Sequence, residues 1–160
     1  GMMRMTPEIN AKLLPAAKPE GPAEVRCITC HRGLTDPRTI DRVLLDEASR
    51  GSVDGTIKKY CELGGEHYGE AGYDFSPGPL IQVSETLVEQ NKDVDGGLAV
   101  ARLAGELNPE SARAHVMLGQ ILARKGDKPA AIASLEKALA LEPDNRWVQR
   151  LLAQMREPAK

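Results

Sequence analysis

The chain has 160 residues, a mass of 17.3 kDa and a formal net charge of −2. This length suits one ordinary domain or two small modules, and it excludes a large enzyme. Because 21 Lys and Arg residues are balanced by 23 Asp and Glu residues, the chain lacks the basic field that binds a nucleic-acid backbone. Aromatic residues make up only 3% of the chain, so its core must come mainly from Leu, Ala, Ile and Val. We therefore predict an all-α protein that does not bind nucleic acid.

The N-terminus and the distribution of apolar residues bear on where the protein resides. No run of about 18 apolar residues is present, so we expect no membrane span in this chain. Gly1 precedes Met2, which is not how translation begins, and we interpret it as a residue left by tag removal. A secretory signal or a further domain upstream of Met2 would then be absent from this sequence.

The first predicted element is a short amphipathic helix over about residues 2–15. Its apolar residues recur at roughly helical spacing until Pro15 interrupts the pattern. These residues are Met2, Met5, Ile9, Leu13 and Leu14. Residues 16–24 are rich in Pro and Gly, so we predict a loop that leads to Cys27.

Two further helices are predicted in the middle of the chain. The first begins near Ile40 and is closed by Gly51. The second covers about residues 55–63, with Asp54 as its N-cap and the Gly-Gly pair at 64–65 as its end. Both helices fall in a segment that connects the N-terminal residues to the C-terminal half.

An irregular segment at residues 67–79 holds most of the aromatic side chains of the chain, Tyr68, Tyr73 and Phe75. Glycines and prolines interrupt any helical pattern there. We interpret this segment as a packed link between modules. We also expect the small N-terminal segment to pack against these aromatic residues, because a segment of about 35 residues buries too little apolar surface to fold alone.

A sequence repeat is the clearest pattern in the C-terminal half. Pro109 and Pro143 each follow a helix-like apolar run, and the interval between them sets the period. A period of about 34 residues is that of tetratricopeptide repeats (TPRs), in which two antiparallel helices pack closely. With Ala112 as the first position, seven residues match the repeat in register: Leu118, Gly119, Leu122, Ala131, Leu135, Ala138 and Pro143. We therefore predict a helix-turn-helix solenoid.

A preceding repeat and a final helix extend this pattern. Residues 78–111 form a degenerate repeat that keeps Gly97, Ala104 and Pro109 in phase, and residues 146–156 supply a capping helix. The solenoid is thus expected to contain about two and a half repeats.

The concave face of the solenoid is expected to bind a protein or peptide. Side chains of a first helix line that face, and here they are Arg113, Val116, Gln120 and Arg124. His115 occupies the position that the repeat usually gives to Trp. We interpret it as a histidine of the core or its rim, without a role in chemistry.

The sequence Cys27-Ile28-Thr29-Cys30-His31 matches the Cys-x-x-Cys-His motif of covalent haem attachment. Two thiols at this spacing can each form a thioether with one haem vinyl group, and the adjacent imidazole then ligates the iron. We therefore interpret Cys27, Cys30 and His31 as a haem c site.

Three other interpretations of this motif stay open. A thioredoxin-like pair would need a βαβ context, and no strand pattern surrounds these residues. A zinc site would need a fourth ligand, which Cys61 or His67 would supply, although the second half of a paired zinc motif is absent. A simple disulfide between Cys27 and Cys30 would leave His31 without a role.

Three short segments around the motif carry a family resemblance: Met2-Met3-Arg4-Met5-Thr6, Ile9-Asn10 and Val25-Arg26-Cys27-Ile28-Thr29-Cys30-His31-Arg32-Gly33. They resemble the haem-binding segments of the cytochrome c subunit of photosynthetic reaction centres. The resemblance covers about residues 2–37. It implies that Cys27 and Cys30 hold the haem, with His31 as proximal and Met2 as distal ligand. Met5 is the competing distal ligand.

The resemblance also implies a function. It implies one-electron transfer through haem c to a redox partner protein, in the periplasm or after export. His–Met ligation leaves no open position for a substrate, and no catalytic carboxylate pair or activated nucleophile is evident, so we expect no enzyme. The family usually carries several such segments, whereas this chain has one, which suggests a fragment or a single-haem relative.

The C-terminal three quarters carry a second resemblance. Ile57-Lys58-Lys59-Tyr60, Tyr68-Gly69 and Tyr73-Asp74-Phe75, followed by the two repeats, resemble the TPR tail appended to various bacterial periplasmic or secreted proteins. We predict three parts: a cytochrome c-like haem segment at 2–37, a helical linker region at 38–77 and a TPR module at 78–157. The alternative is a TPR scaffold without haem, whose Cys-x-x-Cys-His is a zinc or disulfide site.

Overall fold

The structure is a computed structural model that describes residues 2–13, 15 and 38–156. These residues form helices and connecting turns, with no strand among them. The elements are α1 (Met2–Glu8), the π-helical η1 (Ile9–Leu13), α4 (Ile40–Arg50), α5 (Val53–His67), α6 (Pro77–Glu89), α7 (Val94–Leu107), α8 (Ala112–Arg124), α9 (Lys128–Leu141) and α10 (Arg146–Arg156). The predicted all-α fold class is confirmed. No described helix combines the length and hydrophobicity that a membrane span requires.

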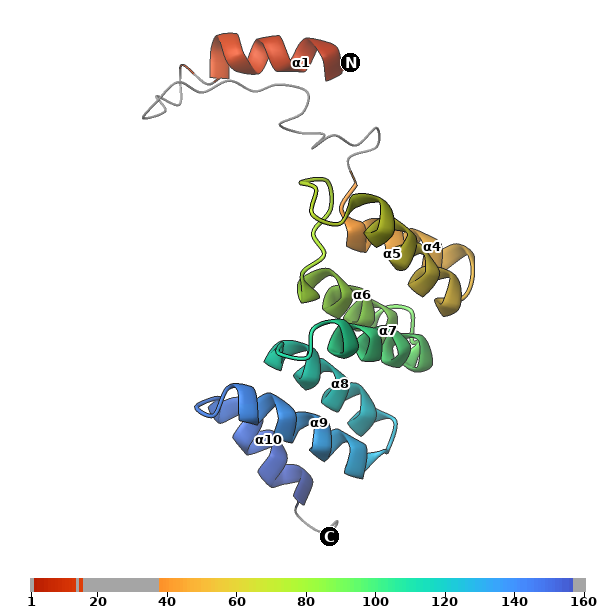
Figure 1. Cartoon of the computed structure of the whole chain (residues 1–160), viewed down its shortest axis with the longest axis vertical. Helices are drawn as coiled ribbons and strands as arrows, with labels where there is room; N and C mark the ends of the chain where they lie inside the picture. Colours follow the sequence, from red (N-terminus) through yellow and green to blue (C-terminus); the bar gives the residue numbers. More distant parts are fainter. Residues whose placement is uncertain (1, 14, 16–37, 157–160) are drawn as a thin grey trace.

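Helices α4 to α10 form a solenoid of stacked helical hairpins (Figure 1). The pairs α4–α5, α6–α7 and α8–α9 follow one another along the stack, and α10 packs on α9. We call α4, α6 and α8 the first helices of their pairs, and α5, α7 and α9 the second helices. Successive first helices are in contact, α4 with α6 and α6 with α8. Two pairs and a single helix therefore occupy the residues where two and a half repeats were predicted.

The segment predicted as a helical linker contributes a hairpin to the same stack. Ile40 and Leu44 of α4 are almost completely buried, as is Tyr60 of α5. They share one apolar cluster with Leu80 of α6 and Val100 of α7. Residues 40–67 thus add a layer to the solenoid, since their apolar faces are buried against the first repeat.

The other end of the solenoid is closed by α10. Val148 and Leu152 of this helix are buried against Ala112, Leu135 and Ala138 of the last pair. The exposed side chains of α10 are mostly Arg and Gln, which is typical of a helix that ends a repeat stack.

The repeat period is visible in the helix caps. The Asp93 carboxylate accepts a hydrogen bond from the backbone N–H of Gly96 at 2.8 Å, and Asp127 accepts from Ala130 at 3.2 Å. These two acidic caps begin the second helices α7 and α9, at positions one repeat period apart. Equivalent side chains thus satisfy equivalent helix N-termini in both repeats.

The first helix after each repeat boundary is capped in the same periodic way. Ser111 Oγ accepts from the N–H of Ala114 at 3.2 Å, and Asn145 Oδ1 accepts from that of Val148 at 3.2 Å. Ser111 and Asn145 are separated by the same period as the two acidic caps. The predicted repeat register is therefore present in local hydrogen bonds as well as in packing.

Small residues set the spacing of the paired helices, as the sequence predicts. A Cβ added at Gly97 of α7 would lie 2.9 Å from the backbone oxygen of Ser84 on α6. The hydroxyl of Ser84 in turn donates to the Gly97 carbonyl at 2.7 Å, in a buried hydrogen bond. The pair α6–α7 therefore approaches too closely for a larger side chain at position 97.

The predicted boundaries of α5 are wrong at both ends. Its N-cap is Ser52, whose Oγ accepts from the N–H of Gly55 at 3.3 Å, whereas Asp54 lies inside the first turn. The helix also continues through residues 64–65 to His67. The Phe75 ring lies 3.7 Å from the position of a Cβ on Gly64, so an aromatic contact covers the last turns of the helix.

The aromatic segment, which was predicted as a packed link between modules, packs against α5. The ring of Phe75 lies 5.6 Å from Tyr60, 5.7 Å from Tyr68 and 6.3 Å from Tyr73, measured between centroids. Burial raises the pKa of the Tyr60 phenol above its ordinary value. The expected support of residues 2–37 by this cluster involves a segment largely outside the described residues, so it stays a prediction.

The N-terminal helix also differs from the prediction of one helix over 2–15. Pro7 lies inside α1 and has no N–H to bond the carbonyl of an earlier turn. The winding then widens to a π-helix at Ile9–Leu13. The amphipathic pattern was therefore sufficient to predict helix, but not its regular continuation past the proline.

Candidate binding site between helices α7 and α9

The predicted haem residues fall outside the part of the chain whose side chains are described. Cys27, Cys30 and His31 lie between α1 and α4, outside the described residues. Met2 begins α1, but its side chain is not described. Met5 is described and is 48% exposed, and its assignment as the competing distal ligand stays a prediction.

The two residues considered as further zinc ligands lie on α5. Cys61 is an exposed free thiol, and His67 Nδ1 lies 3.1 Å from Glu70 Oε2. Within residues 2–13, 15 and 38–156, no group of three or more His, Cys, Asp or Glu side chains could hold a metal ion. The zinc alternative therefore gains no ligand set from the described chain.

The predicted concave-face residues lie on α8, but they differ in their contacts. Arg113 is exposed, and Val116 and Gln120 are half-buried. Arg124 pairs with Glu89 of α6. The hydrogen bond from Arg124 lowers the pKa of the Glu89 carboxyl below its ordinary value. The Arg124–Glu89 ion pair thus links the first helices of two successive pairs, α8 and α6.

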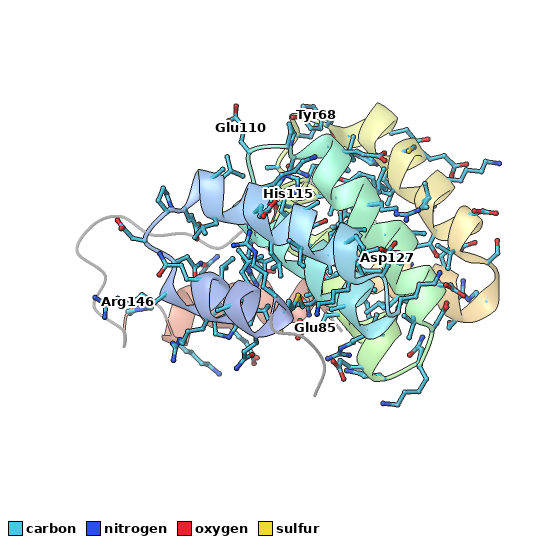
Figure 2. The ribbon with its side chains drawn as sticks, turned by 90° about the horizontal axis from the view of Figure 1, so that it is seen from below. Tyr68, Glu85, Glu110, His115, Asp127 and Arg146 are labelled. Carbon is cyan, nitrogen blue, oxygen red and sulfur yellow. The ribbon has the colours of Figure 1, made fainter. Side chains whose placement is uncertain are left out.

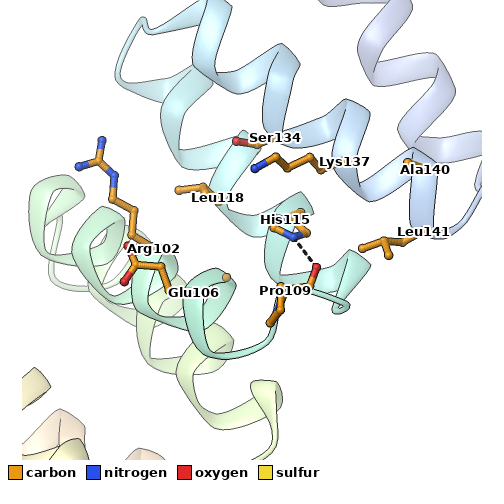
Figure 3. A pocket seen from close by; sticks show the side chains of 10 residues that line it. Arg102, Glu106, Pro109, His115, Leu118, Ser134, Lys137, Ala140 and Leu141 are labelled. Atoms are coloured by element: carbon orange, nitrogen blue, oxygen red, sulfur yellow. Dashed lines mark hydrogen bonds between the residues drawn. The ribbon is translucent and has the colours of Figure 1, made fainter.

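The structure also contains a pocket of about 540 Å³ that the sequence did not predict (Figure 3). It lies between the second helices α7 and α9, with part of α8 beneath. Pro109, Leu118, Ala140 and Leu141 supply its apolar surface. Its volume is in the range of sites that hold a small ligand or a few side chains.

Charged side chains surround the pocket. Arg102 and Glu106 of α7 and Lys137 of α9 lie at its edge. None of the three forms an ion pair with another described residue. Two cations and one carboxylate therefore give the rim an excess of positive charge.

His115 forms the polar centre of the pocket. The residue is only 8% exposed, and Figure 2 shows it among the helices rather than at the edge of the stack. Its Nε2 lies 2.9 Å from the backbone oxygen of Pro109. Because a carbonyl oxygen only accepts, Nε2 must carry a proton. In the neutral tautomer with that proton the lone pair is on Nδ1, and this atom is buried and has no partner among the described residues.

A histidine in place of the usual Trp and a glycine that faces it both line this pocket. The repeat usually places Trp at the position of His115, and the smaller imidazole leaves part of that volume unfilled. Gly105 of α7 faces the ring, since a Cβ built on it would lie 3.7 Å from Nδ1. The predicted burial of His115 is confirmed, and the signal for the pocket was the pairing of this histidine with a glycine on the preceding helix.

Comparison with known proteins identifies a repeat family for the two helices that form one wall and the base of this pocket. Residues 112–145, which contain α8 and α9, match the tetratricopeptide repeat family. Among curated proteins, none matches the chain. A TPR is therefore present, and it marks the solenoid as a protein-interaction module. The comparisons give no support to a reaction-centre cytochrome segment, so that resemblance stays a prediction.

Proposed function

We propose that this chain is a protein-binding solenoid whose first helices α8 and α10 hold an acidic segment of a partner. The observation that carries this proposal is the basic and aromatic surface formed by equivalent positions of two repeats. Trp147 and Arg150 lie one repeat period after Arg113 and Val116. Equivalent positions of a solenoid share a face, so Arg113 and Trp147 line one surface, and Arg150 lies one helical turn after Trp147. Val116 is half-buried and packs on the apolar cluster beneath.

The composition of the two helices supports an acidic partner. Neither residues 112–124 nor residues 146–156 contain an acidic side chain. Arg113 and Arg150 are exposed, and neither forms an ion pair with a described residue. Trp147, the only tryptophan in the chain, is 45% exposed. An exposed aromatic side chain beside accessible guanidinium groups is typical of a protein-binding surface.

Trp147 makes the proposal directly testable. Synthetic peptides rich in Asp and Glu, with a central Leu, should change Trp147 fluorescence, and matched Lys-rich peptides should not. The affinity should fall as salt is raised, because the contacts are charge pairs. In the double variant Arg113→Ala/Arg150→Ala the acidic peptides should bind at least tenfold more weakly. Equal binding of acidic and basic peptides would contradict the proposal.

A second function, covalent haem attachment, is proposed for residues 2–37. The Cys-x-x-Cys-His sequence favours it, because two thiols and an imidazole are the donor set that haem c requires. Cys27 and Cys30 would form the thioethers and His31 would ligate the iron. The bound haem would supply one-electron exchange with a redox partner protein, after export to the periplasm.

The haem proposal is tested by coexpression with a cytochrome c maturation system and export. We expect a c-type pyridine haemochrome spectrum and one haem per chain, with none in the Cys27→Ala/Cys30→Ala variant. A chain that stays free of covalent haem while a control cytochrome matures would contradict the proposal. Stoichiometric zinc or a Cys27–Cys30 disulfide in that sample would instead favour the scaffold without haem.

A further inference from the structure

We infer that the pocket between α7 and α9 receives a tyrosine side chain from an acidic segment of a partner protein. This inference rests on the proposed protein-binding function and adds a second contact surface, on the side of the second helices. The residues that carry it are His115, Arg102 and Lys137, with Gly105 and Leu118 shaping the space (Figure 3).

The polar centre of the pocket requires a hydrogen-bond donor. Nε2 of His115 donates its proton to the Pro109 carbonyl oxygen at 2.9 Å. In the neutral ring Nδ1 then carries no proton, because moving the proton to Nδ1 would break this hydrogen bond. Nδ1 is buried and has no partner among the described residues. A buried acceptor without a partner is unfavourable, and a donor that reaches it removes that penalty.

The surface around this acceptor is apolar. Leu118 of α8 and Ala140 of α9 line the pocket together with the imidazole, and Leu141, at the outer end of α9, is 41% exposed. A fitting group must therefore be apolar along its length and carry one donor at its tip. The phenol of tyrosine has this combination, whereas serine lacks the apolar body and phenylalanine lacks the donor.

The rim specifies the residues that flank the tyrosine. Arg102 on α7 and Lys137 on α9 lie on opposite sides of the opening, and neither is paired with a described carboxylate (Figure 3). Glu106 offsets only one of these two charges. Flanking Asp or Glu residues would complement the remaining positive charge and guide the segment to the pocket.

Access to Nδ1 involves a local adjustment. The atom has almost no exposed surface, so the phenol reaches it only as the lining side chains move aside. Lys137 and Leu141 are exposed and free to change rotamer, and Gly105 presents no side chain that must be displaced. Side-chain movements of this kind are common when interfaces form.

The test uses short fluorescein-labelled peptides of Asp, Glu, Ser and Gly with a central Tyr or Phe, and anisotropy as the readout. The Tyr peptide should bind roughly three- to tenfold more tightly than the Phe peptide, the range expected for one added hydrogen bond. Equal affinities of the two peptides for the wild-type chain would overturn the inference.

Two variants close the pocket by different means. His115→Trp restores the residue that the repeat usually has, and Gly105→Leu places a side chain in the pocket. Each should abolish the preference for Tyr over Phe while circular dichroism shows a folded chain. Gly65→Leu is the matched control, because nothing described lies within 4 Å of the Cβ position at Gly65 on α5. If both variants retain the Tyr preference, the pocket is not the binding site.

The same peptides separate this inference from the proposed function. Tyr-selective binding that survives in Arg113→Ala/Arg150→Ala and is lost in His115→Trp would support the pocket. Binding without Tyr selectivity that is lost only in the double arginine variant would overturn the pocket inference and leave the first-helix surface intact. Absence of binding by any acidic peptide would overturn both.

Discussion

A Cβ added to Gly119 of α8 would lie 2.7 Å from Cγ of Leu135 on α9, a separation that ordinary side chains do not reach. The same added atom would lie 3.2 Å from the backbone oxygen of Ala131. Leu135 has no exposed surface, and it lies at the junction of α8, α9 and α10. The antiparallel packing of the last repeat therefore depends on a hydrogen atom at position 119.

Gly119→Ala should destabilise the chain, although alanine favours helix. The added methyl group must displace Leu135 or separate α8 from α9, and overpacking of this kind costs about 1–3 kcal/mol. Urea unfolding followed by circular dichroism measures the change. Gly65→Ala is the control, because the open space around Gly65 predicts an unchanged or slightly increased stability. Equal stability of the two variants would contradict the close packing.

Leu135→Ala tests the same junction by removing volume. A fully buried leucine truncated to alanine costs about 2–5 kcal/mol. Leu107→Ala, at a side chain that is 52% exposed, should change stability by less than about 0.5 kcal/mol.

Trp147 fluorescence and circular dichroism should report coincident unfolding, because α4 to α10 share contiguous buried clusters. Separate transitions would show that the solenoid does not unfold as one unit.

Ser52→Ala tests the corrected start of α5. Loss of the hydroxyl that accepts from Gly55 leaves a helix N–H without its cap, which costs about 0.5–2 kcal/mol. Asp54→Asn retains helix geometry and should have the smaller effect, since Asp54 contributes only a charge in the first turn. A larger effect at Asp54 in thermal unfolding would restore the boundary predicted from the sequence.

The Glu89–Arg124 pair should make stability depend on pH at the acidic end. The pKa of Glu89 is lowered in the folded chain, so its stabilising contribution is present above its ordinary value of 4.5. That contribution is lost as the pH falls below 4.5 through the folded-state value. Glu89→Gln should therefore reduce the pH dependence of unfolding in this window. An unaltered pH profile for Glu89→Gln would contradict the pair's role.

The distal haem ligand is distinguished by two methionine variants of the haem-loaded protein. Met2→Leu should remove the charge-transfer band that Fe–Met ligation produces. Met5→Leu should leave the band in place, because Met2 and not Met5 is the expected ligand. The Met5 side chain is half exposed. Loss of the band in Met5→Leu alone would transfer the assignment from Met2 to Met5.

Much of the solenoid was predictable from the sequence, because its signals are local or strictly periodic. The small residues Gly97, Gly119 and Ala138 recur where paired helices must approach, and apolar residues recur at helical spacing. Helix formation depends mainly on such short-range patterns, so the elements from α6 to α10 follow from them. The repeat period also predicts that equivalent residues share equivalent packing positions.

The remaining features depend on contacts between residues that are distant along the chain. α5 continues past its two glycines because Phe75 packs on its last turns, and residues 40–67 join the stack because their apolar faces meet α6 and α7. The pocket arises from the pairing of Gly105 with His115, whose Nε2 is held by Pro109. Periodicity determined which helices form and in which register. Only the tertiary structure decided which side chains leave space between them, because unfilled volume depends on how α7, α8 and α9 pack together.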